Sequence, residues 1–299
     1  RLRLKGIDRV ALVACGTAWH AASVARYWIE DFAKIPASAE LASEFRYASP
    51  VLNRRTLVVA VSQSGETADT LACVRLAKQS GCRVLAVVNA QGSTLSREAD
   101  AVIWMRAGVE IGVAATKSYT AQLAALLLFA VHLGRTRGRL NDSRTRGILK
   151  DALSLPKRIQ MILKLRPQIR AAARRLARFP NFMFVGRGLN FPTALEGALK
   201  LKEISYRHAE GYGAGEMKHG PLALVDAKLP VVAVCCDDGQ IYDKTVSNLH
   251  EIRARGASLV VVTDHPGFHL PAGNILLRIP GGRPELSPVR AVVPLQLLA

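Results

Sequence analysis

The chain has 299 residues, of which 49% are hydrophobic and 21% are charged, so it is too long and too apolar to be a disordered segment. Aromatic residues make up only 6%, and this Ala-, Val- and Leu-rich composition predicts an α/β protein, with helices packed on parallel strands. The longest apolar stretch, residues 123–131, covers about half of the ~20 residues that a membrane-spanning helix needs, so we expect no membrane partner.

The hydrophobic pattern of the first half alternates between strand and helix signals. Residues 9–14 form a β-branched run followed by a glycine, which is typical of a buried strand that leads into a helix. Further strands are predicted at residues 57–61, 83–89 and 101–105, and helices at residues 18–32, 66–79 and 117–132. This alternation predicts a doubly wound, flavodoxin-like parallel sheet with flanking helices.

A strongly basic segment follows. Residues 135–178 contain 14 Lys or Arg against two acids, so +12 of the net charge of +18 lies here. The segment has no aromatic residue on which bases could stack, which favours a solvated linker, and we expect no nucleic-acid partner. Four helix-breaking residues are expected to divide it into short helices: Gly138, Gly147, Pro156 and Pro167. The predicted organisation is a first domain at residues 1–138, a basic helical linker at 139–178 and a second domain at 179–299.

The second half repeats the strand and helix signals of the first. Strands are predicted at residues 182–185, 230–236 and 258–264, and helices at residues 193–206 and 242–255. An offset of about 172 to 175 residues places Val13 on Val185 and Ala60 on Ala233. The same offset places residues 85–88 on 260–263. The order and spacing of these short matches predict an internal duplication.

The two copies differ after their second predicted strands. The first copy reads SQSGET at residues 62–67, whereas the second reads CCDDGQ at residues 235–240. The first sequence places three hydroxyl groups and free backbone N–H groups at the start of a helix, where the helix dipole favours an anion. A simple Ser or Thr cap explains one hydroxyl but not the set, and the nucleotide-binding P-loop pattern is absent. We therefore predict a phosphate-binding loop in the first copy.

The cysteine and histidine patterns indicate no metal. The five cysteines are an odd number without a C-x-x-C pair, so reduced thiols are expected, and Cys15, directly after a strand, is expected to be buried. The histidines show no spacing suited to metal ligation, so we expect neither a metal nor another cofactor.

Several long, ungapped motifs resemble one enzyme family across essentially the whole chain. These motifs are CGT at 15–17, SQSGETADTL at 62–71, EIGVAATK at 110–117, ALEGALKLKEISY at 194–206, HAEGYGAGEMKHGPLAL at 208–224 and VPLQLLA at 293–299. They are similar to the isomerase half of the glutamine:fructose-6-phosphate amidotransferases (glucosamine-6-phosphate synthases). The resemblance implies two tandem sugar-isomerase (SIS) domains in a homodimer. It also implies conversion of fructose 6-phosphate and ammonia to glucosamine 6-phosphate for amino-sugar and UDP-N-acetylglucosamine synthesis. The chain opens without an initiator Met or the apolar region of a signal peptide, so we expect a cytoplasmic protein.

The resemblance also implies binding residues. The 6-phosphate of the sugar would be held by Ser62, Gln63, Ser64 and Thr67. Thr17, together with the backbone at Val113 and Ala114, would line the sugar. Ala18 stands where the family usually has a serine, and the lost hydrogen bond would weaken binding by about 0.5 to 1.5 kcal/mol.

The resemblance assigns the chemistry to a predicted helix and a loop. Glu196, Lys200 and Glu203 are spaced i, i+4 and i+7, so they share one helix face. By resemblance, Glu203 is the base that moves a proton between C1 and C2 of the fructosimine, and Lys200 stands beside the reacting carbons. Taken without the family motif, this face would more simply be an ion pair on a solvated surface. His219, supplied by the partner subunit, would open the sugar ring.

Two departures from the family are expected to affect activity. The family begins with a glutaminase domain that supplies ammonia, and it continues past Ala299 into a tail with a Schiff-base lysine. The chain is therefore expected to be truncated at both ends. Two alternatives stay open: a stand-alone SIS sugar-phosphate deaminase or isomerase, and a non-catalytic sugar-phosphate sensor. A sensor needs the phosphate loop but not Lys200, Glu203 and His219.

Overall fold

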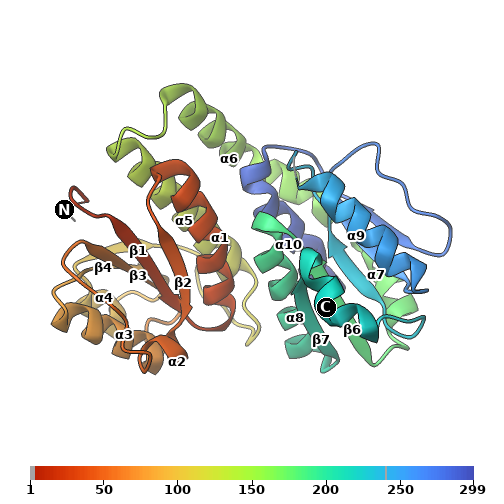
Figure 1. The fold of residues 1–299 in the computed structure, drawn as a ribbon, viewed down its shortest axis with the longest axis horizontal. Coiled ribbons are helices and arrows are strands. Elements are labelled where there is room, and N and C mark those ends of the chain that lie inside the picture. Colours follow the sequence, from red (N-terminus) through yellow and green to blue (C-terminus); the bar gives the residue numbers. More distant parts are fainter. Residues whose placement is uncertain (1–3, 240) are drawn as a thin grey trace. The chain divides into compact units, whose positions relative to one another are not determined.

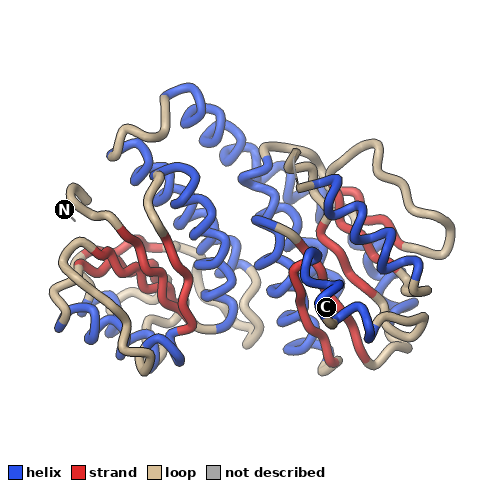
Figure 2. Tube along the Cα trace, in the orientation of Figure 1, coloured by secondary structure: helices blue, strands red, loops and turns tan. Residues whose placement is uncertain are grey.

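The structure is a computed structural model that describes residues 4–239 and 241–299; residues 1–3 of the predicted first domain and Gln240 of the CCDDGQ sequence lie outside the described residues. The chain divides into two compact units, Arg1–Thr145 and Arg146–Ala299 (Figure 1). Each unit contains its own five-stranded parallel sheet, with helices on both sheet faces (Figure 2). This arrangement confirms the predicted α/β class and the two tandem parallel-sheet domains.

The first unit has the strand order β2-β1-β3-β4-β5. Its strands are β1 Arg9–Ala14, β2 Ala37–Leu41, β3 Thr56–Ser62, β4 Arg83–Val88 and β5 Ala101–Trp104. Its helices are α1 Gly16–Ala33, α2 Ala42–Phe45, α3 Ala68–Gln79, α4 Thr94–Glu98 and α5 Lys117–Thr136. Every residue of β3 is buried, as expected for a central strand that is covered on both faces. Successive side chains alternate between the faces, so Val58 and Ala60 share one core cluster with Val74 of α3.

The second unit has the equivalent strand order, β7-β6-β8-β9-β10. Its strands are β6 Asn181–Gly186, β7 His208–Gly213, β8 Val231–Val234, β9 Leu259–Thr263 and β10 Ile275–Arg278. Its helices are α7 Arg166–Leu176, α8 Phe191–Ser205, α9 Tyr242–Ala254 and α10 Ser287–Leu298, with short 3₁₀ segments at Gly188–Asn190, Ala214–His219, Pro221–Leu224 and Pro284–Leu286. Helix α6, Asp142–Leu163, begins in the first unit and ends in the second.

The strand registers confirm the internal duplication. In the first unit Val13 pairs with Ala60, and Ala60 pairs with Ala86 on the next strand. In the second unit the residues that align with them form the same row, because Val185 pairs with Ala233 and Ala233 pairs with Val261. The predicted alignment therefore holds at the level of individual hydrogen-bonded strand neighbours.

Three strands are absent from the sequence-based prediction, and all three lie at sheet edges. β2, β7 and β10 are edge strands, and none of them is fully buried along its length. β2 reads ASAEL and β7 reads HAEGYG, so neither has the continuous apolar run that marks a central strand. The short helices α2 and α4 were missed as well, because four or five residues carry little periodic signal.

The basic segment differs from the prediction of several short helices. α6 runs for 22 residues through Gly147 and Pro156, so these two residues do not divide it. Pro156 is exposed, and water can therefore solvate the backbone carbonyl that the proline leaves without a donor. A Cβ atom at position 147 would lie 2.9 Å from a terminal nitrogen of the Arg283 side chain, which is flexible enough to move aside, so this contact does not by itself require glycine. Pro167 does mark a boundary, since it lies in the first turn of α7.

No helix in the described part of the chain combines the length and apolar character that crossing a membrane requires.

Candidate active site

The first unit has a cavity at the switch point of its sheet. β1 and β3 are neighbours, and the chain leaves them toward opposite sides of the sheet, so the loops after them diverge at their carboxyl ends. The cavity between these loops has a volume of about 160 Å³. Its lining residues are Cys15, Thr17, Ala18, Val61, Ser62, Gln63, Ser64, Thr67, Ala115 and Gln122. Five predicted binding residues, Thr17, Ser62, Gln63, Ser64 and Thr67, thus surround one space.

Hydroxyl groups organise the loop after β3. Ser62 is buried at the end of the strand, and its Oγ accepts a hydrogen bond from the Gly65 N–H at 3.0 Å. The Ser62 and Thr67 hydroxyl oxygens lie 3.3 Å apart. Ser64 is exposed, and its Oγ accepts from the Glu66 N–H at 3.2 Å. Each hydroxyl that accepts from the backbone keeps a proton that it can donate to an anion.

The helix that follows this loop has no side-chain cap. Thr67 occupies the N-cap position of α3, yet its side chain makes no capping hydrogen bond. Cys15, the N-cap of α1 at the same cavity, also makes none. The first backbone N–H groups of both helices are therefore not satisfied by the usual cap, and their positive dipole ends favour an anion. An anion in the cavity would accept from these N–H groups; the missing cap itself is shared by the other helices whose caps are described, such as α4 and α8.

Tight packing fixes the loop conformation. Gly65 has a φ of +69°, and a Cβ atom there would lie 2.3 Å from the Ser93 hydroxyl, so only glycine fits. The Thr94 N–H donates to the Glu66 carboxylate at 2.8 Å. This hydrogen bond lowers the pKa of Glu66, so the exposed carboxylate remains ionised and keeps the loop attached to α4.

The other residues predicted in the first unit lie only partly at the cavity. Val113 is fully exposed, and neither it nor Ala114 lines the cavity, whereas the next residue, Ala115, does. Cys15 is partly buried and lines the cavity, so the prediction of a buried thiol was wrong. Cys15 lies at the carboxyl end of β1, where the loops diverge around the cavity, so its side chain is not fully covered.

Glu110 holds the loop that contains Val113 and Ala114. Its carboxylate accepts hydrogen bonds from the Ser118 N–H at 2.9 Å and from Thr116. Burial alone would raise the pKa of Glu110, but these hydrogen bonds outweigh burial and lower it. The carboxylate therefore stabilises the first turn of α5, where negative charge is favoured by the helix dipole.

In the second unit, α8 presents a buried ion triad. Lys200 and Glu196 are fully buried, with Nζ and Oε1 3.4 Å apart. Glu203, whose side chain is 33% exposed, forms a short ion pair with the same ammonium. Gly197 allows this helix to pack closely, because a Cβ atom there would lie 2.7 Å from Leu295 of α10. The structure thus brings Lys200 and Glu203 together and leaves Glu203 the more accessible carboxylate.

His219 lies outside α8, in the segment that follows β7. It is exposed at the end of the 3₁₀ segment Ala214–His219, directly before Gly220, whose φ is +136°. The neighbouring Lys218 forms an ion pair with Glu251 of α9 at 2.9 Å. This pair attaches the segment to the unit while His219 faces solvent.

The loop after β8, which corresponds to the phosphate-binding candidate, has acidic chemistry instead. Cys235 takes the place of Ser62, Asp237 takes the place of Ser64, and Asp238 follows where the first copy has Gly65; the Asp237 N–H donates to Asp264 at 2.7 Å. Burial raises the pKa of Asp238 to about 6. Carboxylates at this position disfavour a phosphate, so the described part of this loop fits the prediction that only the first copy is built for an anion.

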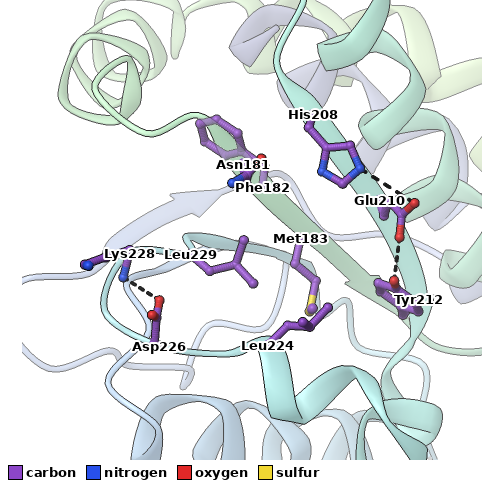
Figure 3. A pocket seen from close by; sticks show the side chains of 10 residues that line it. All are labelled: Asn181, Phe182, Met183, His208, Glu210, Tyr212, Leu224, Asp226, Lys228 and Leu229. Atoms are coloured by element: carbon purple, nitrogen blue, oxygen red, sulfur yellow. Dashed lines mark hydrogen bonds and ion pairs between the residues drawn. The ribbon is translucent and has the colours of Figure 1, made fainter.

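A second cavity, of about 430 Å³, lies along β7 at the amino ends of β6 and β7 (Figure 3). Its floor is apolar, with Met183 and Leu229, and its polar wall consists of alternate residues of β7. Glu210 accepts a hydrogen bond from the Tyr212 hydroxyl at 2.5 Å, which raises the pKa of Tyr212, and it lies 3.7 Å from His208. These groups already pair with one another, so they indicate no particular ligand.

Within residues 4–239 and 241–299, no group of three or more His, Cys, Asp or Glu side chains is arranged to hold a metal ion. The five cysteines are all free, as expected from their odd number and spacing.

The repeated 2-1-3-4-5 strand order places the chain among α/β proteins built from two doubly wound domains, here with a hydroxyl-lined cavity at one switch point. The SIS domain family matches residues 3–132 and 176–299, and the chain belongs to this family. It is 48% identical over 294 residues to glutamine–fructose-6-phosphate aminotransferase [isomerizing] of Thermus thermophilus; the match covers 98% of this chain and 48% of that protein. The chain therefore spans about half the length of the curated relatives that it matches.

Two solved structures extend the comparison. The C-terminal domain of glucosamine-fructose-6-phosphate aminotransferase from Francisella tularensis superimposes with a TM-score of 0.96 and 41% identity, covering 99% of this chain and 84% of that one. Glucosamine-6-phosphate deaminase from Thermotoga maritima superimposes with a TM-score of 0.77 and 25% identity, covering 97% and 83%. The chain is thus much more similar to the aminotransferase domain than to the deaminase.

Proposed function

We propose that this chain is the sugar-isomerising part of a glutamine–fructose-6-phosphate aminotransferase, which converts fructose 6-phosphate and ammonia to glucosamine 6-phosphate. The observation that carries the proposal is the ion triad of α8. A binding module needs the anion cavity, but it has no use for a fully buried ammonium between two carboxylates, one of which stays accessible. The high identity to the aminotransferases supports the same assignment.

In this proposal the first unit binds the substrate. Ser62, Ser64 and Thr67 donate hydrogen bonds to the phosphate, and Gln63 contributes from the same loop. The uncapped start of α3 adds backbone donors and a favourable dipole. Thr17 contacts the sugar from α1, together with backbone groups at Val113 and Ala114.

The second unit supplies the proton-transfer groups. Glu203 takes a proton from C1 of the fructosimine and returns it to C2, so the ketose imine becomes the aldose amine without net gain or loss of protons. Lys200 holds the Glu203 side chain through their ion pair. We propose that it also stands beside the reacting carbons. His219 assists opening of the sugar ring.

The assembly and location of the protein belong to the same proposal. We propose a cytoplasmic homodimer in which His219 serves the site of the partner subunit, and a glutaminase domain that supplies ammonia in the full-length chain. Exposure of His219 is compatible with this role. The product enters amino-sugar synthesis.

The test is an assay of glucosamine 6-phosphate formed from fructose 6-phosphate and ammonium by the full-length protein, so that glutaminase activity is not required. Glu203→Gln keeps the shape of the side chain but removes its basicity, and turnover should fall by about 10²- to 10⁴-fold while sugar-phosphate binding persists. Lys200 keeps Glu196 as a partner in this variant, so the fold should survive.

Ser64→Ala is the matched comparison. Phosphate contacts are made in both the ground and the transition state, so this variant should raise KM and leave kcat nearly unchanged. If the Glu203→Gln variant turned over at the rate of the parent protein, Glu203 would not be the base. Ammonia release from glucosamine 6-phosphate without the synthetic reaction would instead favour the stand-alone deaminase alternative.

A further inference from the structure

A buried amide lies at the cavity of the first unit and is not explained by the roles proposed so far. Gln122, in the second turn of α5, lines the cavity with Ser62, Ser64 and Thr67. It is only 1% exposed. Most of the buried α5 residues that follow it are apolar, beginning with Leu123, Ala125 and Leu126. Ser118 and Tyr119, one turn earlier on the same face, are buried as well, so Gln122 is the last of a short buried polar group at the start of α5, after which the helix face is apolar.

The amide oxygen of Gln122 lacks a hydrogen-bond donor among the residues that the structure describes. A buried acceptor without a donor costs roughly 1 to 3 kcal/mol, so folding alone gives no reason to keep glutamine here. An apolar side chain of similar shape would fit the buried face without this cost. The unpaired amide is therefore better explained by a ligand that completes its hydrogen bonds.

We infer that Gln122 is a substrate-binding residue that recognises a sugar hydroxyl next to the phosphate. This inference rests on the proposed sugar-phosphate function of the same cavity. A phosphate at neutral pH offers mainly acceptor oxygens, so it cannot supply the donor that the Gln122 oxygen lacks. A hydroxyl both donates and accepts, so it can bond to the Oε1 and Nε2 atoms alike. Gln122 thus distinguishes a sugar phosphate from free phosphate, whereas the loop after β3 binds the phosphate group common to both.

The test compares two ligands and two variants by calorimetric titration of the full-length protein with fructose 6-phosphate and with inorganic phosphate. Gln122→Met removes both hydrogen-bonding atoms at similar volume. We expect it to bind fructose 6-phosphate about three- to tenfold more weakly, the loss typical of one or two neutral hydrogen bonds, and to bind inorganic phosphate as the parent does. Gln79→Met, at an exposed position near the end of α3, is the control and should change neither affinity.

Thermal unfolding of the unliganded protein supplies a second readout. Because Gln122→Met removes an unpaired polar atom, its Tm should equal or exceed that of the parent. A lower Tm together with an equal loss of affinity for both ligands would show a structural role and overturn the inference. An unchanged affinity for fructose 6-phosphate would overturn it as well. If the parent binds inorganic phosphate but no sugar phosphate, the proposed function fails as well.

Gln122→Glu keeps the inference testable if the methionine variant does not fold. This substitution keeps the shape and one acceptor but places a negative charge at the cavity. We expect both fructose 6-phosphate and inorganic phosphate to bind more weakly because of charge repulsion. Parental binding of both ligands by this variant would show that Gln122 does not face the ligand.

Discussion

Buried charges in the second unit depend on more than one partner each. Lys200 is held by two carboxylates, and Arg290, also fully buried, lies 2.9 Å from Asp264 and 3.9 Å from Asp151. Removing the sole partner of a buried charge typically costs about 3 to 5 kcal/mol. A second partner reduces this loss. Glu203 can therefore be changed for a kinetic test, because Lys200 still pairs with Glu196.

Asp238 gives a pH prediction at the scale of one residue. Burial raises its pKa from 3.8 to about 6, so the folded state holds a proton that the unfolded state releases between these values. The free energy of unfolding should therefore fall as pH rises from about 4 to 6, because the unfolded state binds fewer protons there. Asp238→Asn removes this titration and should raise the Tm at pH 7.

The measurement is thermal unfolding of Asp238→Asn and the parent at pH 4 and at pH 7. At pH 4 the carboxyl is largely protonated in the folded state, so the two proteins should differ little. Asp226→Asn, at an exposed position outside this loop, serves as the control, because the charge of Asp237 itself helps to raise the pKa of Asp238. A stabilisation of equal size at both pH values would contradict a titration of Asp238.

At the scale of elements, the basic segment has an ordered cationic surface. Lys150, Lys157 and Lys164 recur every seven residues, so they lie along one line of α6 and its C-terminal end, and all three are exposed. The opposite face contains Ile148, Leu155 and Ile162, which are buried. α6 is thus an amphipathic helix with a solvated basic face, in place of the several short helices expected from its Gly and Pro content.

This surface should bind nucleic acid only through its charge. A single-stranded oligonucleotide titrated against the protein should bind without sequence preference, and the affinity should fall steeply between about 50 and 200 mM salt. No aromatic side chain lies in residues 135–178 to stack on bases. Binding to one sequence that persists at about 200 mM salt would contradict this prediction.

For the whole molecule, we expect ligand binding to raise thermal stability. A ligand that binds only the folded state adds RT ln(1 + [L]/Kd) to the free energy of unfolding, or about 2.7 kcal/mol at a hundredfold excess over Kd. Fructose 6-phosphate should therefore raise the Tm of the protein. Differential scanning fluorimetry over a range of ligand concentrations measures this shift.

Unphosphorylated fructose is the control for the phosphate site. It lacks the group that the hydroxyl-lined loop after β3 would hold, so its protection should be far smaller. Equal protection by the two sugars, or protection by neither, would show that residues 62–67 do not form a phosphate site.

The sequence by itself determined the features that depend on local periodicity. β1 has the predicted bounds, Arg9–Ala14, because a continuous apolar run marks a central parallel strand. The duplication was readable because its matches lie on such central strands. The shared face of Glu196, Lys200 and Glu203 followed from helical spacing alone. The hydroxyl-rich loop was visible because its residue types and its position between strand and helix are both local features.

Tertiary structure decided what depends on contacts between distant segments. The edge strands β2, β7 and β10 are defined by a neighbour far along the chain rather than by their own mixed sequences. Spacing cannot show that Lys200 is buried, and without the family motif an exposed ion pair was the simpler interpretation. Gln122 reaches the cavity only because α5 packs beside loops more than 50 residues earlier in the chain. Burial and cavity lining arise when the layers assemble, so no local pattern encodes them.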